Sequence, residues 1–305
     1  MRSLTIVRPG ILTTIQDLGR WGLQSKGMPV CGAMDDWSHR AANRLVGNDE
    51  NAATLEVTLV GPHVQFDDDA FFAVTGAEFR ASLDDAAIAM NTRVYAKAGS
   101  VLTFGARGRG ARAYLAVAGG VNVPQVLGSR STHLLTRMGG YEGRALKAGD
   151  RIPIGEQADA HDAIAPRFAP GVPVPLPSGG ARLRVVGVDA RLASGLTSQR
   201  FRVSPQSNRM GYRLEGGGID TGPAGELTSA GVPIGAVQVP PMGQPILLMN
   251  DHATTGGYAI AAAVIAADLR VAGQLAPGDW IEFEACTLDA ADEALRRQEA
   301  AFGAR

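Results

Sequence analysis

The 305-residue sequence has few cysteines, little net charge and no long apolar run, and each shortage excludes a class of protein. Two cysteines, Cys31 and Cys286, are too few for a disulfide framework or a metal site built from thiolates. No window approaches the roughly 18 uninterrupted apolar residues of a membrane-spanning helix. The formal net charge of -1 provides no overall field to hold nucleic acid or an acidic membrane. Small molecules and other proteins are therefore the expected partners.

Several catalytic signatures are also missing. There is no G-x-x-x-x-G-K-[ST] phosphate loop, no H-E-x-x-H or H-x-x-x-H spacing and no G-x-S-x-G nucleophile turn. The histidines are dispersed without clustered acidic ligands, so no metal site is predicted. The N-terminus reaches Pro9 and Gly10 after a very short apolar run and lacks a secretory apolar core. We therefore expect a cytoplasmic protein.

Glycine, in contrast, is abundant, with 39 residues, close to twice the usual share of about 7%. Short runs with period-two alternation are separated by turn signals, and the clearest runs are 55–66, 100–105, 111–120 and 181–187. This pattern predicts a mainly β protein, organised as a barrel or sandwich rather than as alternating strands and helices.

A proline-rich stretch at 156–180 without hydrophobic periodicity is the predicted linker. Segments 148–154 and 277–283 each begin with a Gly-Asp turn followed by apolar alternation, and each closes its half of the chain. This repetition indicates an ancient duplication of one β-rich domain, although common hairpin chemistry is an alternative explanation. The predicted domains are 1–155 and 181–305.

Three helices are predicted from spacing and capping residues. The first covers 35–46, with Asp35 or Asp36 as its N-cap. A small-residue helix is predicted over 258–270. The C-terminal segment is predicted to form an amphipathic helix capped by Thr287.

The first polar, glycine-dense blocks contain candidate site residues. Gln16, Asp17 and Arg20 lie within five residues of one another. Arginine offers a planar fork for a carboxylate or phosphate, and an aspartate can orient it or act as a base. An ion pair within the loop explains Asp17 and Arg20 equally well. The further candidate binding residues in this half are Asp35, Asn43 and Glu56.

The richest block, 238–258, follows a predicted buried strand, where small-molecule pockets are common. His252 is the natural acid–base group near neutral pH, and with the preceding Asp251 it is a predicted catalytic residue, as is Asp17. The alternative is that His252 is a surface turn residue and the two threonines of this block cap a helix. The candidate binding residues in this half are Ser229, Gln238, Thr254, Thr255 and Tyr258.

At these blocks the chain resembles the biotin-dependent carboxyltransferase family, also called allophanate hydrolase subunit 2. The blocks include TTIQDLGRWG, GAMDDWSHRAANRLVGN, SNRMGYRL and GAVQVPPMGQPILLMNDHATTGGY. They run in order over about residues 4–284. The resemblance implies two tandem cyclophilin-like β-barrel domains with a few short helices, which agrees with the duplicated halves.

The resemblance implies two activities, and the free-standing length favours the first. One is that of the C subunit of a 5-oxoprolinase, which opens 5-oxoproline to glutamate with ATP bound through the complex. Its partners are a B-type subunit of the allophanate hydrolase subunit 1 family and a separate A-type subunit. The other is carboxyl transfer from carboxybiotin to urea or a related amide. The chain has no A-M-K-M segment, so biotin would come only on a partner chain.

The chain departs from the family pattern at a few positions. Where the family commonly has Arg-Gln, His252 and Ala253 stand, and Ala230 replaces a glutamate. Ala259 follows Tyr258 where proline is usual. The missing side chains favour a third hypothesis, a non-catalytic regulatory partner of a B-type subunit.

Overall fold

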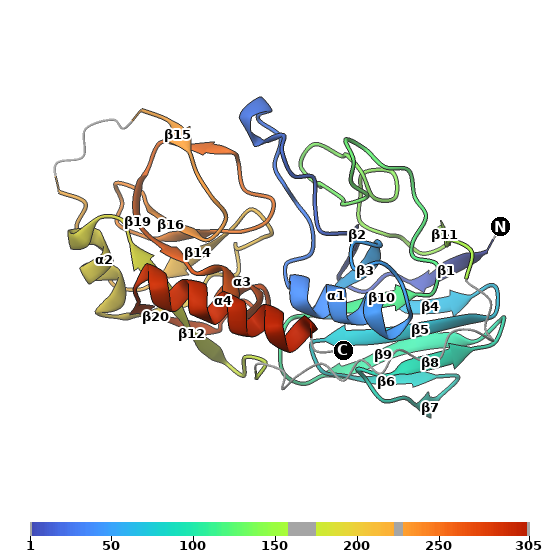
Figure 1. Cartoon of the computed structure of the whole chain (residues 1–305). Helices are drawn as coiled ribbons and strands as arrows, with labels where there is room; N and C mark the ends of the chain where they lie inside the picture. Colours follow the sequence, from blue (N-terminus) through green and yellow to red (C-terminus); the bar gives the residue numbers. More distant parts are fainter. Residues whose placement is uncertain (1, 158–174, 223–227, 304–305) are drawn as a thin grey trace. The chain divides into compact units, whose positions relative to one another are not determined.

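The computed structural model describes residues 2–157, 175–222 and 228–303. They fall into two compact units (Figure 1). The first is drawn from Met1–Arg20 and Cys31–Pro170, and the second from Trp21–Val30 and Gly171–Ala304. Most of the predicted linker, residues 158–174, lies outside the described residues.

The first unit consists of two sheets with antiparallel pairing. One runs in the order β11 (Arg151–Pro153), β1 (Ser3–Arg8), β4 (His63–Phe66), β9 (Val101–Arg107), β6 (Phe79–Leu83) and β7 (Ala86–Ala87). The other runs in the order β2 (Leu12–Gln16), β3 (Thr54–Thr58), β10 (Arg112–Val117), β5 (Ala70–Gly76) and β8 (Arg93–Ala96). The mainly β prediction is confirmed, but this half is two open sheets and not the predicted barrel.

The connection between β1 and β2 shows why no barrel closes here. The chain leaves one sheet at Arg8 and enters the other at Leu12 through Pro9 and Gly10. Proline has no N–H to donate to a neighbouring strand, and Gly10 has a φ of 72°, which does not occur in a regular β-strand. The two strands therefore separate into different sheets.

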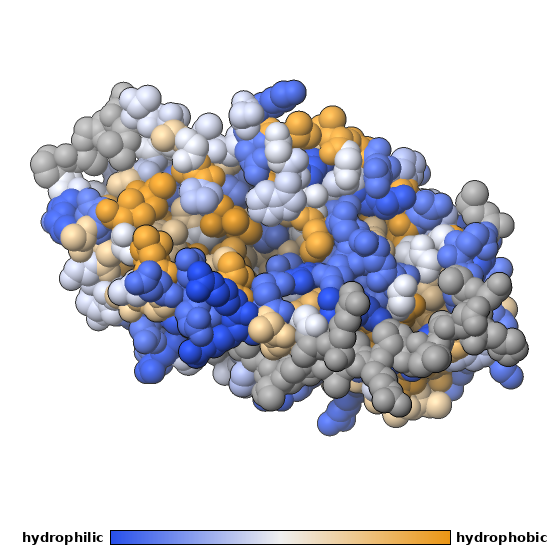
Figure 2. Space-filling view, viewed as in Figure 1, coloured by the Kyte–Doolittle hydropathy of each residue, from blue (hydrophilic) through white to orange (hydrophobic). Residues whose placement is uncertain are grey.

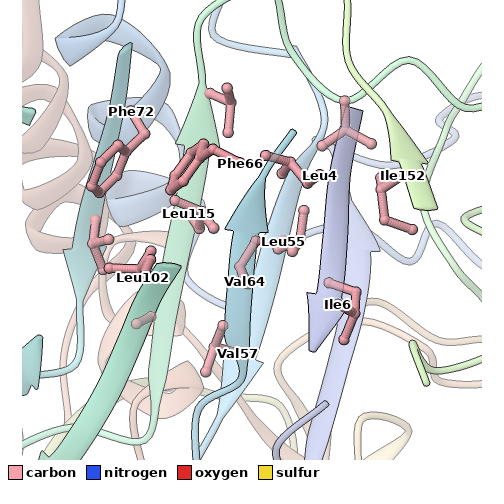
Figure 3. Close-up of a cluster of buried hydrophobic side chains, with 14 of the residues drawn as sticks. Leu4, Ile6, Leu55, Val57, Val64, Phe66, Phe72, Leu102, Leu115 and Ile152 are labelled. Atoms are coloured by element: carbon pink, nitrogen blue, oxygen red, sulfur yellow. The ribbon is translucent and has the colours of Figure 1, made fainter. Parts of the chain in front are cut away.

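The hydrophobic core of the first unit is drawn from both sheets (Figure 3). Leu4 and Ile6 of β1 are fully buried, as are Leu55 of β3 and Phe66 of β4. Alternation along each strand sends every second side chain into this core, as the period-two runs predict. The intervening side chains point the other way.

Helix α1 (Asp36–Leu45) packs on the outer face of the five-stranded sheet, against β5 and β10. Both faces of β10 are covered, so all six of its residues are buried. The predicted helix and its N-cap are confirmed, because the side chain of Asp35 accepts a hydrogen bond from the backbone N–H of Ser38 at 2.9 Å.

The second unit is a closed barrel, as predicted for this half. Its strand order is β12 (Gly180–Gly187), β19 (Ala259–Val264), β16 (Ala236–Val239), β17 (Ile246–Leu248), β14 (Gly211–Glu215), β13 (Arg200–Val203) and β20 (Trp280–Ala285). A separate two-stranded ribbon pairs β15 (Ala230–Gly231) with β18 (Thr255–Gly256). The remaining elements are η1 (Gln24–Lys26), α2 (Ala190–Thr197), α3 (Ala266–Gly273) and α4 (Leu288–Gly303).

The helix predicted over 258–270 is wrong in its first half. Residues 259–264 form strand β19, and only the segment from Ala266 is helical. β19 pairs with β12 on one side and β16 on the other. These two ladders satisfy its backbone and outweigh the helix preference of its alanines.

The C-terminal helix is confirmed as α4, and the hydroxyl of Thr287 accepts a hydrogen bond from the N–H of Ala290 at 3.2 Å. Figure 2 shows hydrophilic residues over α4, as expected for the outward face of an amphipathic helix. Within the described ranges, no helix is long and apolar enough to cross a membrane.

The two Gly-Asp turns have the same hydrogen-bond pattern in both units. The N–H of Gly149 donates to the carbonyl of Ile6 at 2.8 Å, and that of Gly278 donates to the carbonyl of Val203 at 2.8 Å. The carboxylates of Asp150 and Asp279 each accept a hydrogen bond from the N–H three residues earlier, at 2.7 and 2.9 Å. The sequence repeat therefore corresponds to a repeated structural detail.

Candidate functional site

A row of polar residues crosses the outer face of the five-stranded sheet in the first unit. Thr14 of β2 pairs with Glu56 of β3, Glu56 with Tyr114 of β10, and Tyr114 with Thr75 of β5. All four side chains are at most 1% exposed. Because α1 covers this face, the predicted site residue Glu56 lies in a closed polar layer between sheet and helix.

The carboxylate of Glu56 accepts a hydrogen bond from the loop that precedes α1. Its Oε2 accepts hydrogen bonds from the N–H of Met34 and the hydroxyl of Tyr114, both at 2.9 Å. The guanidinium of Arg112 lies 3.9 Å from Oε1. Burial, with the carboxylates of Glu56 and Asp35 nearby, raises the pKa of Tyr114 well above its usual value. The phenol therefore remains a hydrogen-bond donor to Glu56.

His39 and Asn43 project from α1 into the same layer. The Nδ1 of His39 lies 2.9 Å from the hydroxyl of Thr54, and the side-chain amide of Asn43 donates to the carbonyl of Ala52 at 2.7 Å. Burial lowers the pKa of His39 to about 4, although the nearby carboxylates of Asp17, Glu56 and Asp35 oppose the shift. His39 is therefore neutral at physiological pH.

Acidification is expected to destabilise the protein through His39. The pKa of His39 is about 4 in the folded chain, and its ordinary value of 6.5 applies to the unfolded chain. Between these pH values the unfolded chain therefore binds more protons than the folded chain. The free energy of unfolding then falls as the pH is lowered, by about 3 kcal/mol in total at about 1.4 kcal/mol per unit. Chemical denaturation between about pH 7 and pH 4 measures the slope. A His39→Gln variant with the same slope as the wild type would contradict the assignment.

Asp17, predicted as a base, anchors a distant loop. Its Oδ1 accepts hydrogen bonds from the hydroxyls of Ser129 and Ser131, at 2.6 and 2.5 Å, and from the N–H of Gly19 at 2.8 Å. Its Oδ2 accepts from the N–H of Arg130 at 2.6 Å. The side chain is 3% exposed. This carboxylate is thus committed to holding the loop at 129–131.

Gln16 and Arg20 bind the same loop but keep one polar atom each without a partner. The amide nitrogen of Gln16 donates to the carbonyl of Thr132 at 3.2 Å, and Nη2 of Arg20 donates to that of Ser131 at 2.5 Å. Within the part of the chain that the structure describes, Oε1 of Gln16 and Nη1 of Arg20 are buried without a hydrogen bond. Such atoms are rare in folded proteins and usually meet a water or a ligand.

In the second unit, Asp251 forms a bidentate ion pair with Arg209. The Nε and Nη2 atoms of Arg209 each lie 3.0 Å from a different carboxylate oxygen, and the N–H of Asp251 donates to the carbonyl of Arg209 at 2.9 Å. Both side chains are 4% exposed. The sequence patterns do not single out Arg209 itself, although they mark its block SNRMGY. The pair could have been predicted from its opposite charges, because one glycine-containing block has an arginine and another has an aspartate.

His252 is buried in the same turn, with only 6% exposed, so the surface-turn alternative is wrong. Its Nδ1 lies 2.8 Å from the carbonyl of Met249, and its Nε2 lies 3.1 Å from the carbonyl of Val232. Both ring nitrogens therefore face backbone carbonyl oxygens, which can only accept a hydrogen bond. The ring connects the turn after β17 to the segment after β15.

The ribbon of β15 and β18 gathers the remaining predicted residues of this unit. Thr255 pairs with Gly231, and Gly256 pairs with Ala230, next to Ser229. Thr255, Ser229 and Tyr258 are exposed, Thr254 is half-buried, and Gln238 is 5% exposed. Thr255 lies in a strand, so the alternative that it caps a helix is wrong.

The fold agrees with what the comparisons with known proteins show. Residues 26–285 match the family model described as carboxyltransferase domain, subdomain A and B, and the chain belongs to this family. It is 44% identical to the C subunit of 5-oxoprolinase from Escherichia coli (strain K12), over 98% of this chain and 96% of that protein. It is 40% identical to the corresponding 5-oxoprolinase chain from Haemophilus influenzae, over 94% and 92%.

A solved structure of Kluyveromyces lactis urea amidolyase is also similar, with a TM-score of 0.86 and 30% identity. The match covers 99% of this chain but only 20% of that one. The predicted family resemblance is therefore confirmed, as is the prediction of a chain like the C subunit of 5-oxoprolinase.

Proposed function

We propose that this chain is a subunit of an ATP-dependent 5-oxoprolinase and works with A-type and B-type subunits to convert 5-oxoproline to glutamate. One observation carries the proposal: the 44% identity with the C subunit of 5-oxoprolinase extends over almost the whole of both chains. The B-type partner belongs to the allophanate hydrolase subunit 1 family. A cytoplasmic location is part of the proposal, because the reaction consumes ATP.

ATP supplies the free energy for opening an unactivated lactam, and we propose that another subunit binds it. Helix N-termini are the usual places where a chain without a phosphate loop holds phosphates. In the described part of this chain, α1 and α2 are capped by their own Asp35 and Asp189, which accept hydrogen bonds from the first-turn N–H groups, and α3 has Asp268 in its first turn. Their carboxylates would repel a phosphate, so these residues do not fit ATP.

For the three predicted catalytic residues we propose positioning roles. Asp17 holds the loop at 129–131, Asp251 is paired with Arg209, and both ring nitrogens of His252 face backbone carbonyls. A group that abstracts a proton needs a free lone pair directed at the substrate. In the first unit, the residues proposed to face a ligand are Gln16 and Arg20, with Asp35, Asn43 and Glu56 supporting them from the closed layer. In the second unit, they are Ser229, Gln238, Thr254, Thr255 and Tyr258.

We also propose that both units derive from one cyclophilin-like domain. The matching hydrogen bonds of the two Gly-Asp turns support this origin. In the first unit, the duplicated domain would have opened into two sheets.

Co-expression with A-type and B-type subunits tests the activity. The complex should release glutamate from 5-oxoproline only when ATP is present. A correctly assembled complex without this activity would contradict the proposal and favour the regulatory alternative, in which the chain binds its B-type partner without chemistry of its own.

The similarity to urea amidolyase favours a second candidate, a biotin-dependent carboxyltransferase acting on urea or a related amide. This activity would need a biotinylated partner chain. Avidin should then abolish it, whereas 5-oxoproline opening should be unaffected.

A further inference from the structure

The outward face of the barrel in the second unit contains a buried amide nitrogen without an acceptor. Gln238 of β16 lies between Ile246 of β17 and Ile260 of β19 in the strand register. Both isoleucines are half-buried, whereas the preceding residue Val237 and its partner Leu247 are fully buried. Gln238 thus shares the outward face with two partly accessible apolar side chains.

The Nε2 atom of Gln238 is buried and has no hydrogen-bond partner among residues 2–157, 175–222 and 228–303. A buried donor left without an acceptor costs about 1–3 kcal/mol. A glutamine that served only to fill space would be replaced by methionine or leucine without that cost. The unsatisfied amide therefore points to a ligand.

Gly256 of the ribbon packs directly over this amide. A Cβ built on Gly256 would overlap Nε2 of Gln238, so any larger residue here would push the amide aside. The backbone of Gly256 is not in the left-handed region, so its conformation does not require glycine. The amide itself occupies the place that a side chain at position 256 would take.

The ribbon that covers the amide is short, and among the described residues few backbone hydrogen bonds join its two strands. It has two residue pairs between β15 and β18, and the N–H of Val232 donates to the carbonyl of Thr254 at 3.1 Å. A segment with so few hydrogen bonds opens at lower cost than the barrel strands. Displacement of the ribbon would take Gly256 away from the amide.

We propose that Nε2 of Gln238 donates a hydrogen bond to an oxygen of a small carbonyl or carboxylate compound, with Ile246 and Ile260 against the apolar part of that compound. This inference rests on the proposed function, since 5-oxoproline offers both a ring carbonyl and a carboxylate. Gln238 then acts in substrate recognition, and Gly256 leaves the room that the amide of Gln238 occupies.

Two alanine variants on opposite strands of the ribbon form a matched pair. Gly256→Ala places a methyl group against the amide, whereas a Cβ on Gly231 meets nothing within 4 Å. We expect Gly256→Ala to weaken 5-oxoproline binding to the assembled complex about tenfold, the value of about one hydrogen bond, and Gly231→Ala to leave it unchanged. Equal affinities in the two variants would overturn the inference.

The side-chain amide of Gln238 can be followed directly in the full-length chain by ¹⁵N NMR, assigned with Gln238→Met. Added 2-pyrrolidone, which has only the ring carbonyl, or proline, which has only the carboxylate, should shift this signal, and the effective probe identifies the oxygen bound. No shift with either probe or with 5-oxoproline overturns the inference. A shift in a chain whose complex releases no glutamate instead contradicts the proposed function alone.

Discussion

Arg209→Met is expected to lower the free energy of unfolding by about 3–5 kcal/mol, because it leaves a buried carboxylate without its counter-charge. The pair is bidentate, with both N–O distances at 3.0 Å, and both side chains are 4% exposed. Chemical denaturation of the variant and the wild type measures the difference.

A second variant separates the charge from the shape of this pair. Adding Asp251→Asn to Arg209→Met removes the unpaired charge but keeps a side chain of the same size. The double variant should recover about 2 kcal/mol, the difference between burying an unpaired charge and an unpaired amide. Arg209→Lys should stay well below the wild type, because an ammonium cannot form both bonds of the fork. A double variant no more stable than Arg209→Met would contradict the ion-pair account.

Asp17→Ala is expected to cost about 3–5 kcal/mol, because several buried donors lose one common acceptor. These donors are the hydroxyls of Ser129 and Ser131 and the N–H groups of Gly19 and Arg130. Three of the four lie more than a hundred residues further along the chain, so the variant should release the loop from the end of β2. Asp292→Ala, an exposed change on α4, is the control and should have little effect.

Asp17→Asn distinguishes an anchor from a base. Asparagine keeps one acceptor oxygen, so it should lose less stability than alanine, and the complex should retain activity where the fold survives. A fully stable Asp17→Asn protein whose complex has lost all activity would instead show that Asp17 takes part in the chemistry.

The elements that the sequence predicted well are those set by local rules. Alternating runs became strands, Asp35 caps α1, and the Gly-Asp turns precede β11 and β20. The errors came from long-range pairing. The alanine-rich segment 259–264 is a strand because two neighbouring strands bond it, and no local pattern records those neighbours.

The candidate residues were taken from the polar blocks of the sequence, but their roles depend on partners that the sequence does not reveal. Asp17 is defined by serines at 129 and 131, and His252 by carbonyls of Met249 and Val232. Backbone carbonyls carry no residue-specific signal, so composition cannot reveal that both ring nitrogens are engaged. The unsatisfied amide of Gln238 likewise becomes visible only when its surroundings are known.

The most direct test of the account is glutamate release from 5-oxoproline by a complex assembled from purified A-type and B-type subunits and this chain. The account predicts ATP-dependent release that disappears when this chain is omitted and returns when it is added back. Release at the same rate without this chain, or none from the complete and correctly assembled complex, would contradict it.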